Sequence, residues 1–175
     1  FAKTVEEIKK KDSTIAVEVL TSDFNGSIES IKTVVESPIK VFAQNLETVE
    51  RLTHPIRDPR AGYQKTLTVL KKAKELNSNI ITKSSIILGM GETDEEINKT
   101  FEDLRLHEVD IVTLGQYLRP TLNHLPIDRW VTPDEFEKYR KEGLEYGFKE
   151  VVSGPFVRSS YRAERALELN NVGLA

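Results

Sequence analysis

The 175-residue sequence contains no cysteine. Within these residues, this absence excludes disulfide bonds, thiolate zinc sites, cysteine nucleophiles and cysteine ligands to an iron–sulfur cluster. No apolar run approaches the roughly 20 residues that a membrane-spanning helix needs. The net charge of −3 shows no basic excess of the kind that indicates a nucleic-acid partner. We therefore expect neither a membrane nor a nucleic acid among the partners.

Histidine is also scarce, and the spacing of His54, His107 and His124 fits no metal site. What is present is an ordinary globular composition, with 38% apolar and 30% charged residues. Such a composition suffices for one domain with a hydrophobic core.

Helical and extended patterns alternate along the chain. Runs of apolar and β-branched residues predict strands at residues 14–20, 41–43, 80–88, 109–114 and 148–152. Apolar residues at helical spacing predict helices at residues 4–11, 28–35 and 66–76. Two further helices begin at capping boxes, which pair Thr93 with Glu96 and Thr132 with Glu135. Residues 54–60 are predicted to form a polar loop.

The alternation of strand and helix predicts an α/β fold with a parallel sheet and right-handed crossovers. An open doubly wound sheet and a piece of a barrel both fit this order. A complete eight-fold barrel takes about 250 residues, so the chain holds only about half of one.

Candidate site residues gather at the predicted carboxyl ends of the strands, which meet at one edge of such a sheet. They are polar residues or glycines: Asp23, Asn45, Glu47, Gly89, Gly91, Glu92, Gln116, Tyr117 and the stretch 158–161. Loops between strands and helices are polar in any case, because they meet water. The pattern therefore indicates a site without identifying its ligand.

The turn at Gly89, Gly91 and Glu92 follows a strand and opens a helix. It does not match a dinucleotide-binding turn, because Asp94 stands at the third glycine position and Glu92 would repel a pyrophosphate. A carboxylate in a glycine-lined turn suits a ribose, an adenine or a sulfonium. It suits equally the amino end of a helix, where acidic residues are favoured.

Asn45 and Glu47 lie two residues apart, so in an extended chain both side chains point to one side. Together they could bind a vicinal diol, although local hydrogen bonds within a loop explain them as well. Lys83 lies inside a predicted strand; facing inward it needs an anionic partner or a site, and facing outward it is solvated. An inward lysine could also serve as a Schiff-base nucleophile.

The stretch 153–163 places two adjacent serines, Ser159 and Ser160, beside Arg158 and Tyr161 after a Gly-Pro break. Taken alone, either serine could cap a final helix over residues 161–169. The same cluster of hydroxyls and a guanidinium could instead face an anion or a metal.

Several motifs in this order resemble lipoyl synthase, a radical S-adenosylmethionine (SAM) enzyme. They are 45–49 (NLETV), 57–61 (RDPRA), 82–84 (TKS), 88–96 (LGMGETDEE), 114–118 (LGQYL) and 153–161 (SGPFVRSSY). The resemblance implies that residues 1–175 form the C-terminal part of a partial (β/α)6 barrel, in which 153–175 is the tail. In that family two sulfur atoms are inserted at C6 and C8 of a protein-bound octanoyl group.

The resemblance also implies two 4Fe-4S clusters, one of which cleaves SAM while the other gives up sulfur. Ser160 would be a ligand of the second cluster, with Ser159 as the second choice and Arg158 beside it as a further catalytic residue. The residues expected along the SAM pocket are Asn45, Glu47, Lys83, Gly89, Glu92 and Gln116. The implied partners are octanoylated lipoyl carrier domains (glycine cleavage H protein and 2-oxo acid dehydrogenase E2) and an electron donor such as ferredoxin or flavodoxin.

Some residues depart from the family pattern: Gln44 stands where histidine is common, and Arg119 where glutamine is frequent. The six cluster cysteines are expected before Phe1, so this cysteine-free piece alone is expected to be inactive. A mitochondrial matrix location is expected, with the bacterial cytoplasm as the alternative. Two other readings stay open: a degenerate homologue that binds a lipoyl domain without catalysis, and another barrel enzyme that uses Lys83.

Overall fold

The computed structural model describes residues 1–161 and residue 163. Its centre is a five-stranded parallel sheet in which the strand order is the chain order. The strands are β1 (Glu18–Leu20), β2 (Val41–Ala43), β3 (Ile81–Leu88), β4 (Ile111–Gln116) and β5 (Glu150–Ser153). The predicted parallel α/β fold is therefore confirmed.

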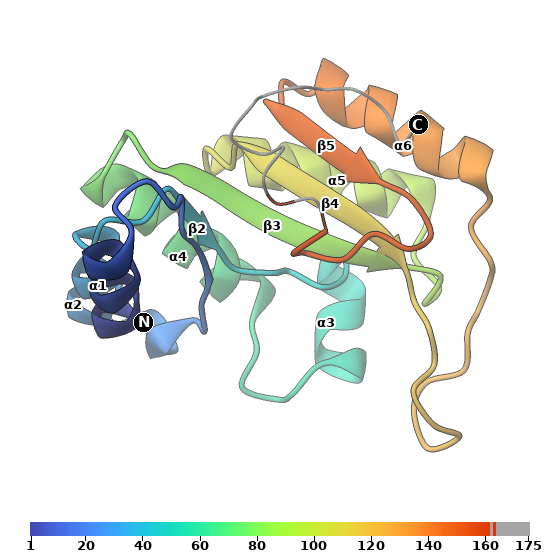
Figure 1. The fold of residues 1–175 in the computed structure, drawn as a ribbon. Helices are drawn as coiled ribbons and strands as arrows, with labels where there is room; N and C mark the ends of the chain where they lie inside the picture. The colour runs from blue at the N-terminus through green and yellow to red at the C-terminus, as the bar shows by residue number, and fades with distance from the viewer. Residues whose placement is uncertain (162, 164–175) are drawn as a thin grey trace.

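Six helices and a short 3-10 helix accompany the strands in the described part of the chain, with α1 before β1 and the others between successive strands (Figure 1). They are α1 (Ala2–Lys11), η1 (Phe24–Gly26), α2 (Ile28–Val35), α3 (Glu50–Ile56), α4 (Tyr63–Leu76), α5 (Asp94–Leu106) and α6 (Pro133–Glu145). Both predicted capping boxes form with their reciprocal hydrogen bonds, and Pro133 occupies the start of α6. No helix in this part of the chain is long and apolar enough to cross a membrane.

Two predicted elements differ from the structure. The strand predicted at 14–20 is reduced to β1, and part of the loop predicted at 54–60 belongs to α3, which contains Pro55. Proline lacks the N–H of a regular helical turn, yet Leu52 and Thr53 of α3 are buried. Tertiary packing here outweighs the local preference of the sequence.

The strand order decides between the two architectures that the alternation of elements left open, and it confirms the partial barrel that the resemblance implied. A doubly wound sheet reverses direction at a switch point, whereas this sheet proceeds from β1 to β5 without reversal. Successive right-handed crossovers then place the helices on one face, and Figure 1 shows α4 and α5 behind the sheet. The sheet is that of a partial barrel.

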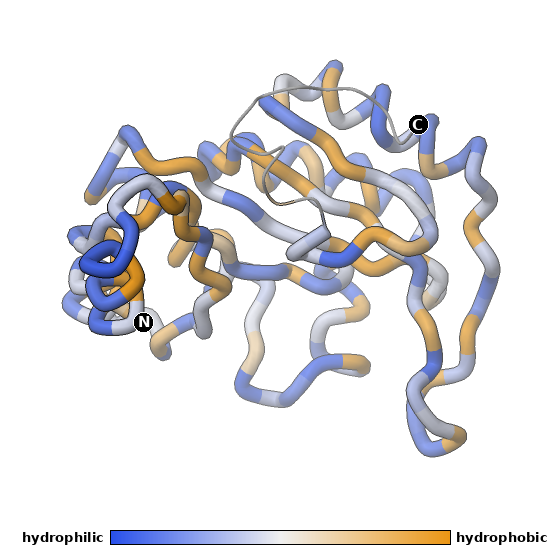
Figure 2. The backbone as a smooth tube through the Cα atoms, in the orientation of Figure 1, coloured by the Kyte–Doolittle hydropathy of each residue, from blue (hydrophilic) through white to orange (hydrophobic). Residues whose placement is uncertain are grey.

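The two faces of the sheet differ in chemistry. The face that packs on the helices is apolar and includes Val19, Phe42, Ile86, Val112, Leu114 and Val151. Residues of opposite register lie on the other face, here called the inner face. It combines apolar residues such as Val41 and Ile111 with Gly115 and the polar residues Glu18, Lys83, Ser85, Thr113 and Glu150. Figure 2 shows hydrophobic and hydrophilic residues interleaved along the central strands. The helix-covered face supplies the core, and the inner face supplies polar groups.

Candidate functional site

An open cleft of about 680 Å³ lies at the carboxyl ends of β1 and β2. Among the residues that line it are Asp23, Gln44, Asn45, Glu47, Arg57 and Lys65. The structure therefore brings Asn45 and Glu47 together with Asp23, as expected from their places at the strand ends. The position of the cleft agrees with the general location of sites in parallel α/β folds.

Asn45 and Glu47 contact each other at the cleft. The Asn45 Nδ2 donates a hydrogen bond to Glu47 Oε1 at 3.0 Å. Glu47 has a left-handed backbone with φ of 66°, yet its N–H donates to the Ser85 carbonyl at 2.9 Å and its own carbonyl accepts from Ile87 at 2.8 Å. This bridge to β3 holds a strained residue in place, as is common at binding sites.

Two buried acceptor atoms at the cleft lack a hydrogen-bond partner among the described residues. They are Gln44 Oε1 and Asn45 Oδ1. A buried acceptor without a partner is unfavourable by about 1–3 kcal/mol. The cleft therefore suits a ligand that offers N–H or O–H donors, such as the hydroxyls of a ribose.

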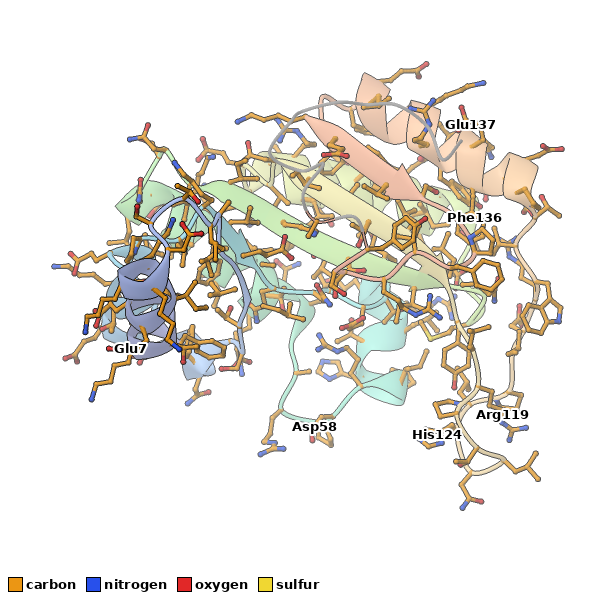
Figure 3. All side chains as sticks on the ribbon, in the orientation of Figure 1. Glu7, Asp58, Arg119, His124, Phe136 and Glu137 are labelled. Carbon is orange, nitrogen blue, oxygen red and sulfur yellow. The ribbon has the colours of Figure 1, made fainter. Side chains whose placement is uncertain are left out.

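Arg57 supports the residues that carry these acceptors. Its Nη1 donates to the carbonyl oxygens of Asn45 at 3.3 Å and Leu46 at 3.2 Å. Nearby, side-chain and backbone hydrogen bonds from Arg60 hold the pKa of Asp58 well below its usual range. Figure 3 shows Asp58 on the loop that leads away from α3. The sequence placed Arg57 only in the 57–61 motif, and its contacts with the Asn45 and Leu46 carbonyls depend on the fold.

In the turn after β3, the carboxylate of Glu92 accepts hydrogen bonds from the turn itself. Glu92 is buried and accepts hydrogen bonds from the N–H groups of Gly89 at 2.6 Å and Met90 at 2.9 Å. Gly89 and Gly91 have φ of 97° and 101°, a region that glycine adopts readily. Arg51 of α3 also donates to the Gly91 carbonyl at 2.7 Å. Glu92 thus stabilises the turn and is absent from the lining of the cleft.

The side chain of Gln116 likewise bonds to backbone groups around it. Its Nε2 donates to the carbonyls of Tyr117 and Arg129, and its Oε1 accepts from Val131 N–H at 2.9 Å. These bonds fasten the long loop 117–131 to the sheet. Figure 3 shows Arg119 and His124 of that loop far out on its projecting end.

Lys83 faces inward, which the sequence could not decide. Its side chain is only 2% exposed, and its Nζ lies 2.9 Å and 3.1 Å from the two carboxylate oxygens of Glu18. An ammonium group paired in this way is not a nucleophile. The ion pair therefore argues against the Schiff-base reading.

The segment after β5 returns across the inner face of the sheet (Figure 1). Gly154 N–H donates to the Leu114 carbonyl at 3.1 Å, and Val157 is buried. The Arg158 Nη1 donates to the Val157 carbonyl at 2.6 Å. Ser160 is exposed, and its hydroxyl makes no hydrogen bond to a described residue. The helix expected over 161–169 lies outside the described residues except for Tyr161 and residue 163.

Among the residues that the structure describes, no three histidine, aspartate or glutamate side chains gather as a metal site. The candidate residues form separate groups: the cleft with Asn45 and Glu47, the Lys83–Glu18 pair on the inner face, and the serines beyond β5. Glu92 and Gln116 support the loops around them.

Comparisons with known proteins agree with this architecture. The family model of the Radical SAM superfamily matches residues 1–104. A solved radical S-adenosylmethionine methyltransferase, TsrM from Kitasatospora setae, aligns with a TM-score of 0.51 at 12% identity, over 73% of this chain and 26% of its own. That likeness concerns the fold alone.

Curated relatives are much more similar. The lipoyl synthase of Halorhodospira halophila is 59% identical over 99% of this chain, and that of Legionella pneumophila (strain Corby) is 58% identical over 99%. The lipoyl synthase of Ectopseudomonas mendocina is 58% identical over the whole chain. The chain spans about half the length of these relatives, at 52%, 53% and 50% respectively. The chain belongs to the radical SAM superfamily.

Proposed function

We propose that the protein is a lipoyl synthase, which inserts two sulfur atoms at C6 and C8 of a protein-bound octanoyl group. The observation that carries the proposal is the 59% identity to a lipoyl synthase along 99% of this chain. Residues 1–175 would form one incomplete barrel domain with 153–175 as its tail. The cysteine ligands would come from a part of the protein outside these residues.

The cleft fits SAM as a ligand. Asn45 and Glu47 would hold the ribose, because a carboxylate accepts from its hydroxyls and the Asn45 Oδ1 lacks a partner within the described chain. Gly89, Glu92 and Gln116 would shape the neighbouring loops, and Lys83 with Glu18 would set the charge of the inner face. Bound SAM supplies the hydrogen-abstracting radical, and an iron–sulfur cluster supplies the sulfur.

Ser160 would be the cluster ligand from this chain, with Ser159 as the second choice. Its exposed hydroxyl has no competing partner among the described residues, which fits a site open to a metal. An oxygen ligand is harder and binds iron more weakly than a thiolate, so it can leave when sulfur is removed. Arg158, two residues before it, would stabilise the negative charge of the serine alkoxide or of the cluster.

The proposed partners follow from the reaction. The substrates would be octanoylated carrier domains, namely the glycine cleavage H protein and the E2 of 2-oxo acid dehydrogenases, and ferredoxin or flavodoxin would donate electrons. The compared lipoyl synthases are bacterial. They support the bacterial cytoplasm, the alternative location, and give no support to the mitochondrial matrix.

Reconstitution of the full-length protein with iron and sulfide tests the proposal. We expect two clusters per chain, and Ser160→Ala should change the electron paramagnetic resonance (EPR) spectrum of one cluster and abolish lipoyl formation. Ser159→Ala tests whether the neighbouring hydroxyl is the ligand instead. Ser78 is an exposed serine before β3, and Ser78→Ala is the control that should have no effect.

Unchanged spectra and activity in Ser160→Ala would refute the ligand role. A full-length protein that takes up no cluster but binds an octanoylated carrier domain would instead identify a non-catalytic homologue. A substrate-dependent borohydride adduct at Lys83 would favour the other barrel enzyme.

A further inference from the structure

Gly115 is an unusual residue for its place in the sheet. It lies inside β4, it is buried, and it pairs in register with Ile87 of β3. Glycine inside a strand weakens it, and often marks a site where another backbone approaches closely. The structure shows such an approach at this position.

The approaching backbone belongs to the C-terminal segment, residues 154–161. A Cβ atom added to Gly115 would lie 2.1 Å from the Val157 carbonyl oxygen and 3.0 Å from Arg158 Nη1. The first distance is far below van der Waals contact, and the obstructing atom is backbone, so no change of rotamer relieves it. The carbonyl would have to move by on the order of 1 Å.

The segment has little freedom to move elsewhere, because it is bonded on both sides of Gly115. Gly154 N–H donates to the Leu114 carbonyl at 3.1 Å, and Gln116 N–H donates to the Pro155 carbonyl at 3.4 Å. Val157 also donates to the Gly154 carbonyl at 3.1 Å, and its side chain is 2% exposed. Displacing Val157 must therefore disturb the turn that carries the next residues.

We propose that Gly115 is a positioning residue that sets where Arg158, Ser159 and Ser160 lie on the inner face. The missing Cβ lets the Val157 carbonyl lie against β4, and Arg158 donates to that same carbonyl. Ser160 lies three residues after Val157 in the chain. The placement of the segment stands on these contacts, whereas the consequence for a cluster rests on the proposed function.

Gly115→Ala tests this proposal, with Gly143→Ala as the matched control. Gly143 is also buried, but it lies in α6, where an added Cβ would meet a Val151 side-chain methyl at 2.9 Å and no backbone atom of the C-terminal segment. Alanine is also preferred to glycine inside a helix. Both variants add one methyl group to the interior, and only the first displaces Val157.

The measurement is hydrogen–deuterium exchange of the full-length reconstituted protein, followed in peptides that cover residues 152–161. We expect Gly115→Ala to raise exchange at Gly154 and Val157 by about tenfold through local opening, and Gly143→Ala to leave it unchanged. EPR should show that Gly115→Ala perturbs the same cluster as Ser160→Ala and spares the other.

Unchanged exchange in Gly115→Ala would overturn the proposal, whatever the EPR spectrum of Ser160→Ala shows. Raised exchange with an unchanged spectrum, where Ser160→Ala does change it, would overturn the link from Gly115 to Ser160. If Ser160→Ala leaves both clusters unchanged, the ligand assignment fails, and exchange alone decides the role of Gly115. Should Gly115→Ala not fold, Val157→Ala loosens the segment from the other side, and unchanged exchange there counts equally against the proposal.

Discussion

The amino and carboxyl ends of the sheet are built differently. At the amino end, the buried Asp110 binds Lys74 at 2.7 Å and Lys149 at 2.8 Å, and also accepts from Thr82 N–H at 3.0 Å. These contacts join α4 and β3 to the residues just before β4 and β5. At the carboxyl end lie an open cleft, two buried acceptors without a partner in the described chain, and the left-handed Glu47.

This difference separates stability from function within one sheet. At the amino end, Asp110 is paired with Lys74 and Lys149, so this cluster stabilises the fold without a ligand. Polar groups at the carboxyl end are held in place by backbone bonds but left partly unpaired, which is unfavourable until a ligand binds. Barrel enzymes in general place their sites at the carboxyl ends of the strands and their stabilising contacts at the other end.

The largest expected effect is at the amino end. Asp110→Ala leaves Lys74, whose side chain is 13% exposed, without its carboxylate, and should lower the free energy of unfolding by about 3 kcal/mol. Urea denaturation of the full-length protein measures this loss. SAM affinity of the folded protein should stay unchanged. Glu75→Ala, which breaks an exposed pair with Lys72, is the control and should leave the urea midpoint in place.

Acid should weaken the same end. Burial alone raises the pKa of Asp110, but hydrogen bonds from Lys149, Lys74 and the Thr82 backbone outweigh it and hold this pKa below the ordinary 3.8. The stabilisation is therefore complete above pH 3.8 and is lost as the pH falls below it. Urea midpoints should show wild type approaching Asp110→Asn only as the pH falls below the ordinary pKa of 3.8. A gap between them that stays constant with pH would contradict this assignment.

At the carboxyl end, replacing Glu47 with glycine should raise the stability of the fold and lower the affinity for SAM. Glu47→Gly relieves the left-handed backbone and should stabilise the fold by about 1 kcal/mol. It should also weaken SAM binding at least about tenfold, because hydrogen bonds to a charged group contribute about 1.5–3 kcal/mol. Glu47→Gln keeps the backbone strain and should lose affinity without gaining stability. Calorimetric titration and urea denaturation measure the two quantities, and equal affinity in all three proteins would exclude Glu47 from the site.

Elements with local signals were predicted well. The capping boxes at Thr93 and Thr132 form as expected, since their reciprocal bonds join residues only three apart. The strand prediction at 41–43 is confirmed, and that at 80–88 differs by one residue. In contrast, α3 was missed because Pro55 argues against a helix and only the burial of Leu52 and Thr53 explains it.

The candidate site shows the same division. Asn45 and Glu47 lie together beyond the carboxyl end of β2, as strand direction predicts, but not through the extended chain that the sequence suggested, because β2 ends at Ala43 and Glu47 has φ of 66°. The orientation of Lys83 depends on Glu18, which lies 65 residues earlier. The internal bonding of Gln116 depends on Arg129 and Val131, which follow a long loop. Gln44 was noted only as a departure from the family pattern, although this residue lines the cleft and its Oε1 is buried without a partner among the described residues.

The sequence by itself determined the alternation of strands and helices, the two capped helices, and the motifs that resemble lipoyl synthase. Each of these depends on residues close together in the chain or on short motifs in order. The resemblance also implied the partial barrel, which the strand order confirms. Only the tertiary structure decided that Lys83 pairs with Glu18 and that Gly115 admits the Val157 carbonyl. These depend on pairs of groups far apart in the chain, whose distance is fixed only when the sheet has formed.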